Sequence, residues 1–155
     1  MMQVPSAPSP ECGTPVLVVT ASSREDDHCS LRAICSDCGW TNHEARSCRD
    51  ALSLARRRPI QVVICARDLP GGGWEAVLDG LAELPHRPRL IVSSRLADHR
   101  LWADVLSLGG YDVLATPFDA GEVARAVTLA WHSSKQEVGR ARFARRGATA
   151  AAIGA

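Results

Sequence analysis

The sequence lacks any long apolar run and any strong excess of charge of one sign. No stretch approaches the roughly 18 consecutive apolar residues that suggest a membrane-spanning helix. The first residues, MMQVPSAPSPECG, show neither the basic segment nor the apolar segment of a secretory signal. The formal net charge of +1 argues against a surface built as a whole for nucleic acid or membrane. We therefore expect a cytoplasmic protein with no membrane partner.

The composition is that of an ordinary globular domain with short tails. The chain has 155 residues, of which 46% are apolar and 23% are charged, and this length suits one domain with a full core. Residues 1–14 are rich in Pro and Ser and are predicted to be a flexible leader, so residues 15–135 form the expected domain. Residues 136–155 hold four arginines against one glutamate. This basic, Ala/Gly-rich segment is predicted to be a disordered tail, because it contains no recognisable nucleic-acid-binding module.

The cysteines offer a metal site as an alternative to core packing. Without an export signal the thiols are expected to stay reduced. Cys35 and Cys38 form a CxxC motif with His28 and His43 nearby, which suggests zinc or redox chemistry. No second CxxC completes a four-ligand set, and helical spacing turns both thiols toward the core. Packing is therefore the favoured interpretation, and no metal site is predicted.

Short apolar runs alternate with amphipathic segments along the chain. The runs have the pattern of strands buried on both faces of a sheet, and the segments between them have helical spacing with start and stop signals. The expected strands are residues 16–19, 40–46, 60–66, 89–94 and 111–118. The expected helices begin at Ser22 or Ser23, Ser47, Trp74, Asp98 and Asp119, and the first four end at Gly39, Pro59, Pro85 and Gly109.

This alternation predicts an α/β fold with a doubly wound parallel sheet. Right-handed crossovers place helices on both faces of such a sheet. Ligands bind at the carboxyl ends of the strands in folds of this kind. The loops that follow the strands should therefore meet at one rim, and "VVICARDLPGGGW", residues 62–74, should contribute one of them.

Several motifs in order carry a resemblance to a known family. They are "DLP" followed by glycines, "IVSS" in the fourth strand, a "GG-Y" segment and "TPF-DAGEV" before the last helix. Over roughly residues 15–132 the chain resembles the receiver domain of bacterial two-component response regulators. The resemblance implies a flavodoxin-like fold with five helices around a five-stranded parallel sheet of order 2-1-3-4-5.

The resemblance also implies a phosphorylation pocket, and here the chain departs from the family. Receivers carry the phosphorylated aspartate four residues before the loop proline, and counting back from Pro70 gives Ala66. The two acidic magnesium ligands correspond to Thr20 and Ala21, and the lysine corresponds to Thr116. Only the hydroxyl position remains, as Ser93. A methyl group cannot attack phosphorus, and Mg²⁺ needs hard oxygen ligands, so we expect no catalytic residue, cofactor or metal.

We therefore expect a stand-alone, degenerate receiver domain that acts in phosphorelay signal transduction by binding proteins. It is not expected to be an enzyme. The predicted partner is a histidine kinase, another regulator or an effector, with a homodimer as a further option, and nucleic acid is not favoured. One alternative is an active phosphorelay receiver with Asp68 as a displaced acceptor. Another is a metal- or nucleic-acid-binding module built on the cysteines and the basic tail.

The partner surface is predicted from aromatic residues near the end of the chain. Trp102, Tyr111 and Trp131 lie in or around the fourth helix, fifth strand and fifth helix. Receivers typically use this surface for dimers and partners, and aromatic side chains are favoured binding anchors. Those of the three that are exposed are expected to contribute to docking.

Overall fold

One five-stranded sheet organises residues 16–135, the part of the chain that the computed structural model describes. All neighbouring strands are parallel and their order is β2-β1-β3-β4-β5. The strands are β1 (Leu17–Ala21), β2 (Thr41–Ala45), β3 (Val62–Ala66), β4 (Arg89–Ser94) and β5 (Asp112–Ala115). The helices are α1 (Glu25–Cys38), α2 (Cys48–Arg57), α3 (Gly73–Ala82), α4 (His99–Leu108) and a last helix, residues 120–135. The predicted leader and tail lie outside the described residues.

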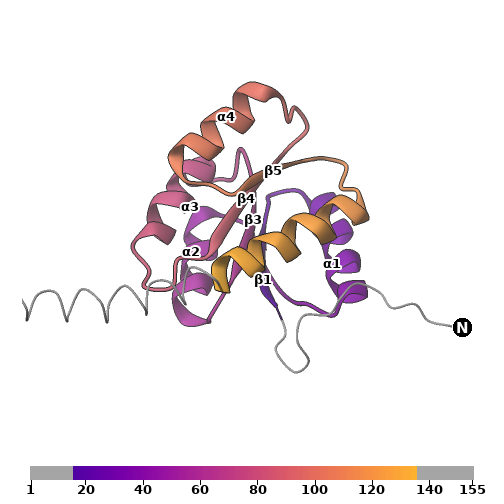
Figure 1. The fold of residues 1–155 in the computed structure, drawn as a ribbon, viewed down its shortest axis with the longest axis horizontal. Helices are drawn as coiled ribbons and strands as arrows, with labels where there is room; N and C mark the ends of the chain where they lie inside the picture. The colour runs from indigo at the N-terminus through magenta and orange to yellow at the C-terminus, as the bar shows by residue number, and fades with distance from the viewer. Residues whose placement is uncertain (1–15, 136–155) are drawn as a thin grey trace, which may run out of the picture.

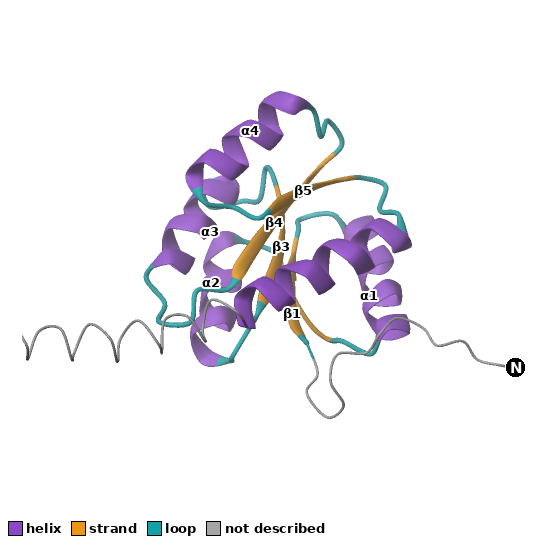
Figure 2. Cartoon of the chain, viewed as in Figure 1, coloured by secondary structure: helices purple, strands orange, loops and turns teal. Residues whose placement is uncertain are grey.

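Helices cover both faces of the sheet. Figure 1 shows α2, α3 and α4 on one side of the strands, and α1 with the last helix, drawn in yellow-orange, on the other. Figure 2 shows the strands as the central layer between them. The alternation along the sequence and the strand order implied by the family resemblance are both confirmed.

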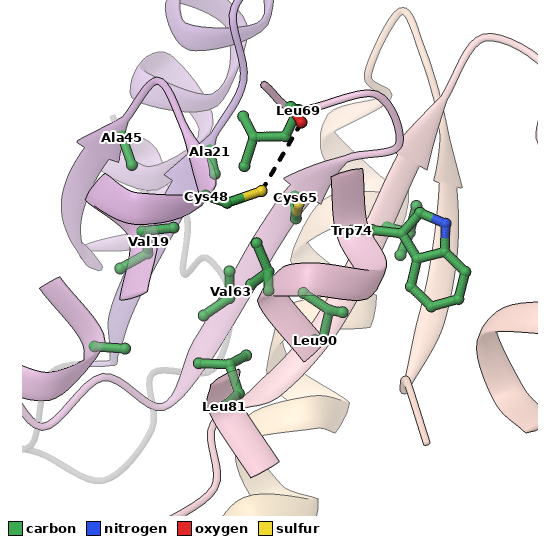
Figure 3. Close-up of a cluster of buried hydrophobic side chains, with 14 of the residues drawn as sticks. Val19, Ala21, Ala45, Cys48, Val63, Cys65, Leu69, Trp74, Leu81 and Leu90 are labelled. Atoms are coloured by element: carbon green, nitrogen blue, oxygen red, sulfur yellow. Dashed lines mark hydrogen bonds between the residues drawn. The ribbon is translucent and has the colours of Figure 1, made fainter. Parts of the chain in front are cut away.

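Two apolar clusters, one on each face, hold these layers together. The first joins β-strand side chains such as Val63 to Trp74 and Leu81 of α3 and to α2 and α4, and Figure 3 shows part of it. The second packs Leu31 of α1 and Trp131 of the last helix on the opposite face. Strand β3 is continuously apolar and β4 has the apolar centre Leu90–Val92, as expected for strands buried from both sides.

Most of the predicted helix boundaries are confirmed by hydrogen bonds. Ser47 and Asp98 accept bonds from the backbone N–H groups three residues ahead, and Asp119 does the same for the last helix. Gly39 and Gly109 end α1 and α4 in the left-handed conformation that glycine adopts without strain.

The start of α1 differs from its prediction. Arg24, rather than Ser22 or Ser23, occupies the N-cap, and its side chain makes no capping bond. Ser22 is instead turned inward, where its hydroxyl accepts a hydrogen bond from the Arg24 N–H at 3.0 Å. The other differences are shifts at element ends, such as β1 extending to Ala21 and α3 ending at Ala82. Among residues 16–135, no helix combines the length and the apolar content that crossing a bilayer requires.

Candidate functional site

A cavity of about 290 Å³ lies where the carboxyl ends of four strands meet. The segments that follow β1, β3, β4 and β5 all contribute to it, as expected for a parallel α/β sheet. Its lining consists of Ser22, Ser23, Arg24, Asp27, Ala66, Arg67, Asp68, Ser93, Ser94, Arg95, Leu96 and Thr116. A second cavity of about 340 Å³ adjoins it and shares Arg24, Asp27, Arg95 and Thr116.

The structure brings three of the five predicted pocket residues together. Ala66, Ser93 and Thr116 line the cavity, and so does Asp68, the alternative acceptor. Thr20 does not: it is buried, and its hydroxyl donates a hydrogen bond to the side-chain oxygen of Asn42 in β2 at 3.0 Å. Ala21 packs in the apolar cluster beneath α2 and α3.

Ser22, which directly follows β1, lines the cavity and holds the start of α1 in place. Its buried hydroxyl donates to the carboxylate of Asp27 at 2.7 Å, and Asp27 is itself buried. Its carbonyl oxygen accepts a hydrogen bond from Nε2 of His28 at 2.8 Å. These bonds tie the first turn of α1 to the end of β1, so one wall of the cavity is built from bonded groups.

A second network on α1 stabilises the outer edge of the sheet. Arg32 donates two hydrogen bonds to the carboxylate of Glu44 in β2, at 2.7 and 3.0 Å. This guanidinium holds the pKa of Glu44 below its ordinary value. Arg46 donates to Glu25 at 2.6 Å and lowers the pKa of Glu25 in the same way. The carboxylates of this network are thus paired with cations away from the cavity.

Three arginines at the cavity were not anticipated from the sequence. Arg24, Arg67 and Arg95 line it together with two aspartates, which gives the lining a formal charge of +1. Arg67 follows β3 directly and Arg95 follows β4 directly. Their position immediately after buried strands is the signal that could have placed them at this rim.

The residues of the cavity do not fit a magnesium ion. Mg²⁺ prefers octahedral oxygen ligands that include one or two carboxylates, whereas Ala66 offers a methyl group and three guanidinium groups repel a divalent cation. Of the two lining carboxylates, Asp27 is already bonded to Ser22. Within residues 16–135 no three His, Cys, Asp or Glu side chains gather in a group that could hold a metal ion.

The CxxC cysteines lie in the α1 layer, as predicted for Cys35. Its side chain is 1% exposed, and burial raises the pKa of the Cys35 thiol to about 12. Cys38 is half-buried and its pKa is raised for the same reason. Cys48 and Cys65 are buried in the opposite cluster, where the Cys48 thiol lies 3.8 Å from the carbonyl oxygen of Leu69 (Figure 3). The five cysteines of the described residues are free thiols.

The predicted partner surface divides between surface and core. Trp102 of α4 is 48% exposed, and Leu108 of the same helix is 57% exposed. Tyr111 is half-buried. Trp131 is fully buried, so its assignment to a docking surface was wrong. Trp131 follows Val123 and Val127 at helical spacing, which turns its side chain toward the sheet. The Nζ atom of Lys135 lies 4.5 Å from the centre of the Trp131 ring.

Comparisons with known proteins agree on the fold. No protein-family model matches the sequence, and no curated protein matches it. The structure matches the signal receiver domain of an HD domain-containing protein from Pseudomonas fluorescens Pf-5, with a TM-score of 0.73 and 24% identity over 90% of this chain and 99% of that one. It matches NtrX from Brucella abortus with a TM-score of 0.74 and 20% identity, over 84% of this chain and 30% of that one.

A third match is the chemotaxis response regulator CheY4 of Vibrio cholerae. The TM-score is 0.69 and the identity 13%, and the match covers 76% of this chain and 99% of that one. The strand order and the arrangement of helices are those of a flavodoxin-like doubly wound sheet. The chain therefore has the fold of response-regulator receiver domains.

Proposed function

We propose that this protein is a degenerate receiver domain, which acts in signal transduction by binding a protein partner and is not phosphorylated at the usual position. The observation that carries the proposal is the end of β3, where Ala66 lines the cavity together with Ser93 and Arg67. A methyl group offers no nucleophilic oxygen for phosphoryl transfer. The function therefore rests on the shape of the domain and its surface, and the protein is not an enzyme.

The electrostatics of the cavity support this proposal. Phosphoryl transfer to a carboxylate concentrates negative charge, which metal ions and positioned cations normally stabilise. Here Thr20 is turned toward Asn42 and Ala21 toward the apolar cluster, so neither adds an oxygen ligand at the cavity. Where receivers carry acidic metal ligands, this cavity presents arginine and hydroxyl groups.

Asp68 is the rival acceptor. It is exposed and lines the cavity, but the same lack of metal ligands and of a positioned lysine applies to it. The two alternatives are separated by incubating the protein with acetyl phosphate and Mg²⁺ and then measuring its intact mass. We expect no added phosphoryl group. A gain of one group that is lost in Asp68→Asn, and kept in the matched exposed variant Asp79→Asn of α3, would establish the displaced acceptor.

The partner surface is proposed to lie on α4. Trp102 and Leu108 expose large apolar side chains on this helix, and aromatic anchors carry much of the energy of protein interfaces. A photo-crosslinking residue at position 102, introduced in the native cell, should capture a histidine kinase, a regulator or an effector. The same residue at exposed position 83, after α3, is the control. Equal crosslinking from both positions would contradict a docking role for α4.

A further inference from the structure

A groove of about 610 Å³ lies at β2, on the outer edge of the sheet. Helix α1 contributes Arg32 and Cys35 to its lining, α2 contributes Leu54, and Trp40 directly precedes the strand. Strand β2 comes first in the sheet order, and within residues 16–135 no strand pairs with its outer side. The groove therefore leaves a sheet edge open between two helices.

Two residues of β2 turn their backbone hydrogen-bonding groups toward this open side. In a parallel pair, alternate residues of a strand bond to a given neighbour. The Thr41 N–H donates to the Val16 carbonyl oxygen at 2.9 Å, and the Ala45 carbonyl oxygen accepts a bond from the segment after β1 at 3.1 Å. Asn42 and Glu44 therefore face away from β1, and their N–H and C=O groups have no partner strand in the described part of the chain. Such an edge is a template for a further strand.

The chain enters the sheet beside this edge. Residues 1–15, which lie outside the described residues, join it at Val16, whose carbonyl oxygen bonds to Thr41 of β2. The other open edge, β5, is separated from β1 by β3 and β4. A strand added outside β2 would lie two strand spacings from β1, roughly 10 Å, and residues 10–15 span up to about 20 Å when extended. The leader is therefore long enough to turn back along β2.

The prolines of the leader have a spacing that an edge strand tolerates. Pro8 and Pro10 alternate with Ala7 and Ser9. Successive N–H groups of a strand point to opposite sides, and proline, which has no N–H, is accepted on an edge strand where that group would face solvent. An added segment can thus bond to β2 through Ala7 and Ser9 while both prolines face outward.

We propose that residues 7–9 of the leader pair with the open edge of β2 as a short antiparallel strand, with Ser9 opposite Asn42 and Ala7 opposite Glu44. Each pair exchanges two backbone N–H···O bonds. The segment covers the groove and blocks the edge against association with other chains. This goes beyond the proposed function, because β2 and β5, against which α4 packs, are opposite edges of the sheet.

The test is amide hydrogen exchange of the intact 155-residue chain, followed by NMR at neutral pH. Pairing should make the Asn42 and Glu44 amides exchange slowly although their strand has no other neighbour on that side. Ala7→Pro/Ser9→Pro removes both leader donors and should speed exchange at these two amides by about tenfold, which corresponds to about 1.4 kcal/mol. Ser6→Pro is the matched control, because its N–H faces outward in the proposed register and its loss should change nothing.

A cross-strand contact gives a direct readout of the register. Pro8 lies opposite His43 as a non-hydrogen-bonded pair, which brings the two Hα atoms close together. A nuclear Overhauser effect between these two atoms should be observed in the parent chain and lost in the double variant. The amide of buried Ile64 in β3 reports opening of the whole domain, so its exchange should be the same in all variants.

Each outcome decides the proposal. Fast exchange of Asn42 and Glu44 in the parent chain, equal effects of Ala7→Pro/Ser9→Pro and the control, or absence of the nuclear Overhauser effect would overturn it. An equal acceleration at Ile64 would do the same. Protection that rises with protein concentration would also overturn it and would assign the edge to a second copy. None of these results bears on phosphorylation, so the proposed function stands or falls by the acetyl phosphate experiment alone.

Discussion

Replacing Ser22 by alanine should destabilise the protein through a single hydroxyl group. That hydroxyl donates to the buried Asp27 carboxylate at 2.7 Å and accepts from the Arg24 N–H at 3.0 Å. In Ser22→Ala both bonds are lost and no other hydrogen bond of the Asp27 carboxylate is present in the described part of the chain. Of the bonds that tie the first turn of α1 to the end of β1, the one from His28 to the Ser22 carbonyl oxygen then remains.

The size of the effect follows from these two bonds. A hydrogen bond to a charged group contributes about 1.5–3 kcal/mol, and removal of a bond of the capping type costs about 1 kcal/mol. Because the two losses share one hydroxyl, we expect the free energy of unfolding to fall by about 2–3 kcal/mol. For a domain of this size that corresponds to a fall of roughly 4–12 °C in the melting temperature.

Urea unfolding followed by circular dichroism measures this loss. Ser23→Ala is the matched control, because Ser23 is the exposed neighbour and exposed substitutions usually change stability by less than about 0.5 kcal/mol. A double-mutant cycle with Asp27→Ala isolates the pairwise energy between the two side chains. The reasoning is refuted if Ser22→Ala and Ser23→Ala unfold at the same urea concentration, or if the cycle gives no coupling.

Three further predictions concern stability and reactivity. Trp131→Ala should lower the free energy of unfolding by about 3–5 kcal/mol, since removal of a fully buried ring leaves a cavity. Trp102→Ala should change the urea midpoint little. Equal losses in the two variants would contradict the burial of Trp131. Glu44→Gln should be less stable than the parent at pH 7, and this deficit should disappear as the pH falls through the folded-state pKa. The hydrogen-bonded ion pair with Arg32 of α1 holds that pKa below its ordinary value, and a carboxyl group with a lowered pKa stabilises the fold only while it is ionised. A deficit that persists at pH 2 would refute the pairing. Iodoacetamide should alkylate exposed Cys29 and spare Cys65 in the folded protein, because burial blocks Cys65 and raises the pKa of its thiol. Peptide mass mapping measures the two sites, and alkylation of Cys65 before Cys29 would contradict this prediction.

The order of elements was predictable because its signals are local. Strands buried on both faces are continuously apolar, and helix starts such as Ser47 and Asp98 need only a side-chain oxygen and an N–H three residues ahead. The start of α1 was missed because the Ser22 hydroxyl bonds to Asp27, five residues away. That contact exists only after the helix has folded back beside β1.

The candidate site was predictable in position but not in charge. Motif positions taken from the family placed Ala66 and Ser93 at one rim, yet those positions exclude Arg67 and Arg95, which follow the same strands. The direction of the Thr20 side chain is set by its hydrogen bond to Asn42 in the neighbouring strand, and sequence patterns do not specify such cross-strand pairs. The burial of Trp131 was visible in its helical spacing from Val127, but the surface implied by the family resemblance was given more weight.

Metal binding is the most direct test of whether the phosphorylation chemistry is absent, because it does not depend on choosing the right phosphoryl donor. Mn²⁺ is paramagnetic and broadens the NMR signals of amides close to it. We predict that titration with Mn²⁺ leaves the amide signals of Ala66, Ser93 and Thr116 no broader than that of Arg56 at the far end of α2. Selective broadening of the three cavity amides would mean that the cavity holds a divalent ion, and would contradict a receiver fold without the chemistry of phosphorylation.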